Sequence, residues 1–128
     1  MAAAARALRE FVGGDLAAAN DEATNLCAIE DPVETPFKSK YAAINVLCAA
    51  RKQLAGLLDA HERERASAGS DAAGGDSAAA EDALCALDVR LGGIHIDVEA
   101  PHDAQGCLER ALAHVTDGGK ARVRQRLR

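Results

Sequence analysis

The chain has 128 residues, which is enough for one small domain. Aromatic residues make up only 2% of it, with no Trp, one Tyr and two Phe, so the core must be built from Leu, Ala, Val and Ile. The formal net charge of −5 at pH 7 disfavours binding to nucleic acid or to an anionic membrane. No uninterrupted apolar run approaches the roughly 20 residues that a membrane-spanning helix needs, so we expect a soluble protein.

The charge is unevenly distributed along the chain. Residues 116–128 contain five basic residues and one acidic residue, whereas residues 1–115 contain ten basic and nineteen acidic residues, a net charge of −9. An acidic body of this kind suits a basic protein partner.

Two helices are predicted at the N-terminus. The first, residues 2–12, is rich in Ala and is expected to end at Gly13 and Gly14, because consecutive glycines favour helix termination. An Ala-rich start with two arginines is also typical of transit peptides, but the acidic residues that follow favour an ordinary helix. Asp15 is a candidate N-cap of the second helix, residues 15–29, in which apolar residues recur at intervals of three and four.

A third and longest helix is predicted to begin near Phe37, after a segment in which two prolines oppose helix formation. Its apolar stripe comprises Tyr41, Ile44, Leu47, Cys48, Leu54, Leu57 and Leu58. The mixed-charge sequence 61–65 beyond the stripe is interpreted as a solvated helical surface, which closes a first group of helices, residues 1–65. Residues 66–78 are small, polar and rich in Gly and Ser, so they are predicted to be a flexible, disordered linker.

Residues 79–115 are predicted to form a helical hairpin with arms separated by Pro101, and Asp103 is a candidate cap of the second arm. In both arms, large and small residues alternate at the spacing of a tetratricopeptide unit. In such a unit the small residues let the two helices pack closely against each other. The alternating residues are Leu91, Gly92, His95, Ala104, Leu108 and Ala111. Leu91 and Leu108 are expected to pack against each other. Because such a unit needs neighbours, the pattern predicts an all-α fold of tetratricopeptide-like hairpins, the start of an α-solenoid.

Two positions depart from the tetratricopeptide pattern. Asp88 stands where the pattern prefers an aromatic residue, and Thr116 stands where a proline would close the unit. Gly118 and Gly119 are expected to end the second arm. The basic residues 116–128 are predicted to be a disordered tail, or the end of a truncated gene product.

Two separated blocks of sequence resemble the N-terminal region of the KIF-binding protein (kinesin-binding protein) family. In that family a PYKSKY-like sequence opens a long helix. After an acidic variable insert come a helix with an LG-x-x-HID-like core and then a Cys-Leu helix. The matching residues are Pro36, Lys38, Ser39, Lys40 and Tyr41, then Leu91, Gly92, His95, Ile96, Asp97, Cys107 and Leu108. The resemblance covers roughly residues 15–115.

The resemblance implies a non-enzymatic scaffold that binds kinesin motor domains and blocks their attachment to microtubules, and so regulates microtubule-based transport. It further implies a cytoplasmic protein associated with the cytoskeleton. The acidic body fits this role, because it can compete with the acidic microtubule surface for a basic motor face. The alternative is a small helical tetratricopeptide-like adaptor or structural subunit with no kinesin link.

No pattern in the sequence indicates a catalytic site, a cofactor, a bound metal or a small-molecule substrate. The four cysteines are Cys27, Cys48, Cys85 and Cys107. They form no CxxC pair, and we expect buried thiols in a reducing compartment. His95 is interpreted as a packing residue. Lys38 and Lys40, where the resemblance is densest, are the candidate partner contacts, with exposed solubilising charge as the alternative.

Overall fold

The computed structural model describes residues 3–68 and 74–127, and the side chains of residues 3–67 and 77–114. The described part is helical and contains no strand, so the predicted all-α class is confirmed. Its helices are α1 (Ala3–Gly13), α2 (Asp15–Cys27), α3 (Lys38–Ala68), α4 (Gly74–Asp97) and α5 (Pro101–Leu127).

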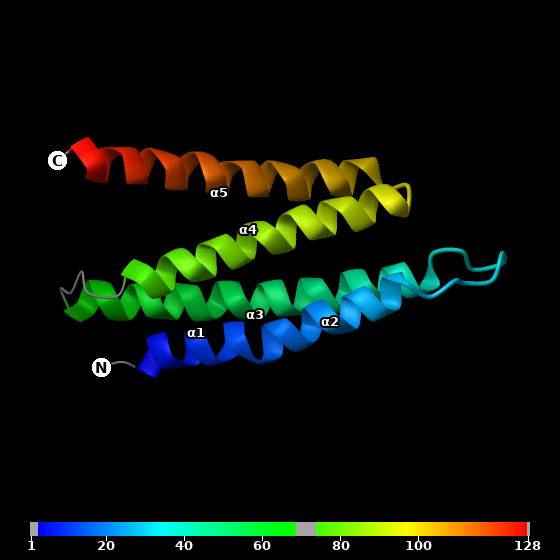
Figure 1. Cartoon of the computed structure of the whole chain (residues 1–128), viewed down its shortest axis with the longest axis horizontal. Helices are drawn as coiled ribbons and strands as arrows, with labels where there is room; N and C mark the ends of the chain where they lie inside the picture. The colour runs from blue at the N-terminus through cyan, green and yellow to red at the C-terminus, as the bar shows by residue number, and fades with distance from the viewer. Residues whose placement is uncertain (1–2, 69–73, 128) are drawn as a thin grey trace.

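The helices are stacked side by side, as Figure 1 shows. Helices α1 and α2 follow each other along one side of α3, and α4 lies between α3 and α5. Helix α1 also contacts α4. Within the described residues α5 packs closely against α4 alone, so it forms one edge of the stack and α1 and α2 form the other.

Helix α3 is the central element, because α1 and α2 on one side and α4 on the other both pack buried leucines against it. With 31 residues it is about 46 Å long at 1.5 Å per residue. Its buried apolar residues recur mostly at intervals of three and four, as one helical face requires. They are Ala43, Ile44, Leu47, Ala50, Leu54 and Leu58. Tyr41 and Cys48, which were assigned to the same stripe, are exposed, because their positions lie beside the buried face.

A close turn at Gly14 separates α1 from α2. The Gly14 N–H donates to the Glu10 carbonyl at 2.9 Å, and a Cβ at Gly14 would lie 2.9 Å from that same oxygen. Only glycine fits this approach. Gly14 also occupies the N-cap of α2, so the prediction of Asp15 as N-cap is wrong. Asp15 is instead the first helical residue, where its charge complements the helix dipole.

The turn between α4 and α5 is closed by backbone hydrogen bonds around Glu99, which has a left-handed φ of 62°. The N–H of Ala100 donates to His95 O at 2.8 Å, and the N–H of Glu99 donates to Ile96 O at 3.0 Å. This is the Schellman pattern of a helix C-terminus. Pro101 separates the two arms, as expected, and is itself the first residue of α5. Asp103 lies inside the first turn of α5, so the prediction that it caps this helix is wrong.

The predicted linker over residues 66–78 is wrong at both of its ends. Residues 66–68 belong to α3 and residues 74–78 to α4, while residues 69–73 lie outside the described residues. The small, polar Ser77 was taken as a linker residue, but it is buried on α4, where a small side chain fits the helix interface.

The interpretation of residues 61–65 as a solvated surface is wrong for His61, because its side chain is only 2% exposed. Its Nδ1 lies 3.1 Å from Ser77 Oγ, which also accepts a hydrogen bond from Arg65 Nη1 at 3.2 Å. These contacts join the end of α3 to the start of α4.

The C-terminal residues also differ from the prediction, since 116–127 continue α5 as helix through Gly118 and Gly119. Glycine lowers helix propensity by about 1 kcal/mol per residue but keeps its backbone donor, unlike proline, so two glycines do not force a helix to end.

Gly92 sets the close approach of α4 and α5. An added Cβ would lie 2.8 Å from both Cγ and Cδ2 of Leu108 on α5, whereas nothing lies within 4 Å of a Cβ added to neighbouring Gly93. The expectation that Gly92 serves helix packing is therefore confirmed.

Gly92→Ala and Gly93→Ala form a matched pair that tests this packing. Gly93→Ala should stabilise the protein by about 0.5–1 kcal/mol, because alanine has the higher helix propensity and meets no neighbour. Gly92→Ala should destabilise it, because the new methyl group displaces Leu108. Urea unfolding measures both changes. Equal stabilisation by the two substitutions would contradict the close approach of α4 and α5.

Candidate functional site

A buried ionic cluster fixes the position of α4 and α5. It consists of Arg51 on α3, Asp88 on α4 and Arg110 on α5, and we call it the Asp88 cluster. The Asp88 side chain is 0% exposed. Its Oδ1 accepts hydrogen bonds from Arg51 Nε at 2.7 Å and from Arg110 Nε and Nη2, both at 3.3 Å. Its Oδ2 accepts from Arg51 Nη2 at 3.3 Å.

Sequence reasoning missed the Asp88 cluster, although a signal for it was present. Asp88 lies three residues before Leu91 and four after Leu84, which places it on the buried face of α4. A carboxylate at such a position must find cationic partners, because an unpaired buried charge is costly. The sequence could not indicate which arginines would reach it, since they come from two other helices.

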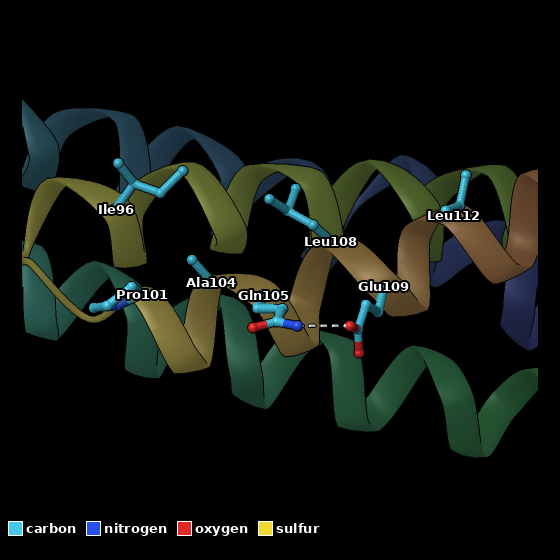
Figure 2. Close-up of a pocket in the computed structure, with 7 residues that line it drawn as sticks. All are labelled: Ile96, Pro101, Ala104, Gln105, Leu108, Glu109 and Leu112. Atoms are coloured by element: carbon cyan, nitrogen blue, oxygen red, sulfur yellow. Dashed lines mark hydrogen bonds between the residues drawn. The ribbon is translucent and has the colours of Figure 1, made fainter.

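An apolar groove of about 380 Å³ lies on the outer side of the α4–α5 hairpin. It is lined by Ile96, Pro101, Ala104, Gln105, Leu108, Glu109 and Leu112, and we call it the α5 groove. Figure 2 shows these residues along α5 and the end of α4, with Gln105 Nε2 donating to Glu109 Oε1 at 2.9 Å. Glu109 is the one charged side chain among these lining residues.

The large apolar side chains of the α5 groove are unusually exposed. Ile96, Leu108 and Leu112 are 59%, 39% and 65% exposed. Leu91 is fully buried, whereas Leu108 lies over Gly92 and is partly exposed to solvent. The expected packing of Leu91 against Leu108 stays a prediction. The groove thus presents apolar surface that no described helix covers.

The opposite edge of the stack is acidic. Residues 10–37 contain seven acidic residues and no Lys, Arg or His. Five of the seven are exposed on α2 and the loop that follows it, namely Asp15, Asp21, Glu22, Glu30 and Glu34. We call these five residues the acidic surface. Figure 1 places α2 and α5 on opposite sides of α3 and α4, so the helix that carries most of the acidic surface and the helix that carries most of the α5 groove lie at opposite edges of the stack.

Arg90 anchors the helix that carries most of the acidic surface. Its Nη1 donates to both the backbone oxygen and Oδ1 of Asn20 at 3.0 Å, and its Nη2 donates to Thr24 Oγ1 at 2.6 Å. These bonds tie α4 to α2, so the two edges of the stack are held in a fixed relation through α4.

The two candidate contact residues, Lys38 and Lys40, begin α3. Lys38 is exposed and Lys40 is half-buried. Between them, Ser39 donates its N–H to Asp31 Oδ2 at 2.8 Å and its hydroxyl to Asp31 Oδ1 at 2.6 Å. These hydrogen bonds hold the pKa of Asp31 below its usual value, with a smaller contribution from the charges of Lys40 and Lys38. A role of the lysines in partner binding stays a prediction.

The cysteines do not share one environment. Cys107 is buried and accepts a hydrogen bond from Arg110 Nη2 at 3.3 Å, while Cys85 donates to the Ala111 carbonyl at 3.5 Å. Cys48 is exposed, so the expectation that every thiol is buried is wrong for it. Partial burial of the Cys48 thiol still raises its pKa, and the neighbouring Cys107 adds to the rise. A raised pKa makes a thiol a weaker nucleophile at neutral pH.

No group of three or more His, Cys, Asp or Glu side chains gathers as a metal site would require, among the residues that the structure describes. His95, assigned to packing, is half-buried on α4. In the same part of the chain, no helix has the length and apolarity needed to cross a membrane.

Comparison with known proteins identified no relative: no family model, no curated protein and no solved structure matches the chain.

Arg51→Met tests the Asp88 cluster, because it removes the shortest bond to a fully buried carboxylate. Asp88 keeps Arg110 as a partner in this variant, so the cost in urea unfolding should be at most the roughly 3–5 kcal/mol of a fully broken buried pair, and more than about 1 kcal/mol. Arg63→Met on the same helix is the control. Its partner Asp59 is 67% exposed, and such surface pairs contribute less than about 1 kcal/mol. Similar losses for the two variants would contradict a structural role for Asp88.

Proposed function

We propose that this protein is a non-enzymatic scaffold that binds a basic protein partner through its acidic surface. The observation that carries the proposal is the charge of residues 10–37, where seven acidic residues occur with no cationic side chain between them. Fixed charge of one sign attracts and orients a partner of the opposite sign.

The helical stack supports a scaffold role in a second way. Helices α4 and α5 form a hairpin in which Gly92 lets the two helices approach, as in a tetratricopeptide unit. We propose that this hairpin is such a unit and that the stack begins a solenoid. Solenoids bind other proteins over extended surfaces, because each unit adds to one continuous face.

The proposed partner is a kinesin motor domain, on the basis of the resemblance to the KIF-binding protein family at residues 36–58 and 84–115. A motor holds a microtubule with a basic face, and an acidic scaffold competes for that face. The protein would then act in the cytoplasm by detaching motors from microtubules. The alternative is an adaptor that uses the same acidic surface for a basic partner other than kinesin.

Microtubule co-sedimentation of a panel of kinesin motor domains tests the proposal. At low salt and micromolar concentration, the protein should move at least one motor from the pellet to the supernatant. The triple variant Asp15→Asn, Asp21→Asn, Glu22→Gln should lose this effect, because it removes three exposed charges of the acidic surface.

The matched control is Asp59→Asn, Glu62→Gln, Asp97→Asn on exposed positions of α3 and α4, which also removes three acidic charges but outside the acidic surface. If no motor is displaced, the kinesin partner is wrong. If the control variant weakens displacement as much as the triple variant does, the binding depends on net charge alone and the proposed surface is wrong.

A further inference from the structure

The loop between α2 and α3 projects beyond the packed helices at one end of the stack, as Figure 1 shows. It is anchored at two points. Asp31 accepts hydrogen bonds from the N–H and the hydroxyl of Ser39, and Phe37 packs against the core and edge-to-face against Tyr41. Between these two points, residues 32–36 are all exposed. The loop therefore presents a short, accessible segment of chain whose ends are fixed to the helices.

This exposed segment contains a threonine followed by a proline. The three prolines of the chain are preceded by Asp31, Thr35 and Ala100, so Thr35 and Pro36 form the single Ser-Pro or Thr-Pro pair in the sequence. Lys38 is the third residue after Thr35, and it is exposed. Kinases select their substrates by the residues beside the acceptor hydroxyl. A hydroxyl followed directly by proline, with a cation two residues later, is the pattern that proline-directed protein kinases prefer.

We propose that Thr35 is a phosphorylation site for a proline-directed protein kinase, and that the phosphate extends the acidic surface. In this reaction Thr35 Oγ1 attacks the γ-phosphorus of Mg-ATP. The bond between that phosphorus and the bridging oxygen breaks, ADP leaves, and the hydroxyl proton passes to the catalytic Asp of the kinase. The product is a phosphate ester on Thr35.

The structure around Thr35 leaves its hydroxyl available to an enzyme. The Thr35 N–H donates to the Pro32 carbonyl at 3.0 Å, and the Thr35 carbonyl accepts from the Lys38 N–H at 3.3 Å, so this residue joins two successive turns. Its hydroxyl makes no hydrogen bond to any of the described residues. A kinase cleft takes its substrate in extended form, and extending this loop breaks turn bonds without unpacking a helix.

The other Ser and Thr hydroxyls of the described side chains are less suited to a kinase. Thr24 lies within α2 and donates to a backbone carbonyl of the same helix at 2.9 Å. Ser39 and Ser77 are buried, and Ser67 is exposed but lies within α3 and is followed by alanine. A hydroxyl inside a helix reaches a kinase cleft only if the helix unwinds. Thr35 therefore combines exposure, a non-helical backbone and a following proline.

The position of Thr35 connects the modification to the proposed function, on which this step rests. Thr35 directly follows Glu34, one of the five residues of the acidic surface. A phosphothreonine carries a charge of about −1.5 to −2 at pH 7. The phosphate thus adds negative charge to the end of the acidic surface. The modified protein should attract a basic partner more strongly, and added salt should weaken this gain.

Phosphorylation of the full, folded chain tests the site. A cyclin-dependent kinase with its cyclin and Mg-ATP should add one phosphoryl group, measured by intact mass, and fragmentation should place it on Thr35. Thr35→Ala and Pro36→Ala should each abolish incorporation, and Lys38→Ala should slow it several-fold. Ser67→Ala, which removes an exposed hydroxyl on α3, is the matched control and should be modified like wild type.

Circular dichroism verifies that each variant stays helical. A wild-type chain that gains no phosphate, or that gains it on another residue, overturns the proposed site. Full incorporation into Pro36→Ala overturns recognition by a proline-directed kinase.

Microtubule co-sedimentation of motor domains tests the role of the phosphate, by comparing the phosphorylated protein with the unmodified one. At low salt the phosphorylated protein should displace a motor at a several-fold lower concentration, and phosphatase treatment should remove this gain. Equal displacement by the two forms overturns the contribution of the phosphate to the acidic surface. If neither form displaces a motor, the kinesin partner is wrong, while the mass measurement still decides whether Thr35 is the modified residue.

Discussion

The arrangement of α4 and α5 depends on one buried carboxylate. Asp88 is completely enclosed, and an unpaired charge in that position would cost several kcal/mol. Its partners come from the helices on either side, Arg51 from α3 and Arg110 from α5. The cluster satisfies the carboxylate only when the three helices are in register along their axes. It therefore specifies position in a stack whose apolar contacts are made mainly by leucines and alanines, which would tolerate small shifts.

The positions of the acidic surface and of the α5 groove depend on this alignment of the helices. Holding α5 on α4 brings Leu108 over Gly92, which opens the α5 groove on the far side of the hairpin. Arg90 on the same helix reaches α2 and fixes the acidic edge relative to the groove. The molecule is thus polarised, with acidic charge at one edge and apolar surface at the other. The proposed binding of a basic partner uses the acidic edge.

Apolar periodicity and helix-breaking residues predicted much of this fold. Intervals of three and four placed the long helix α3, and Gly14 and Pro101 marked the ends of helices, because these signals are local. The errors concern residues whose environment is set by distant parts of the chain. His61 and Ser77 were assigned to solvated or disordered sequence, yet they lie buried against each other.

The candidate site was less predictable than the fold. The hairpin and the tight contact at Gly92 were inferred from spacing, but the exposure of Leu108 was not, because it depends on whether another helix covers α5. The partners of Asp88 come from two other helices, and local spacing carries no information about them. The acidic composition of residues 10–37 is visible in the sequence, while its position opposite the α5 groove requires the structure.

Native-state hydrogen exchange on wild type and Asp88→Asn tests most directly whether the buried carboxylate holds α5 in place. Asparagine keeps the volume of the side chain and removes its charge, so both arginines lose their ionic partner. We expect backbone amides of residues 104–111 to exchange much faster in the variant, because α5 separates from the stack first. Amides of α2 and of the first half of α3 should keep their protection. Unchanged protection of residues 104–111, or an equal loss in all helices, would contradict this role of Asp88.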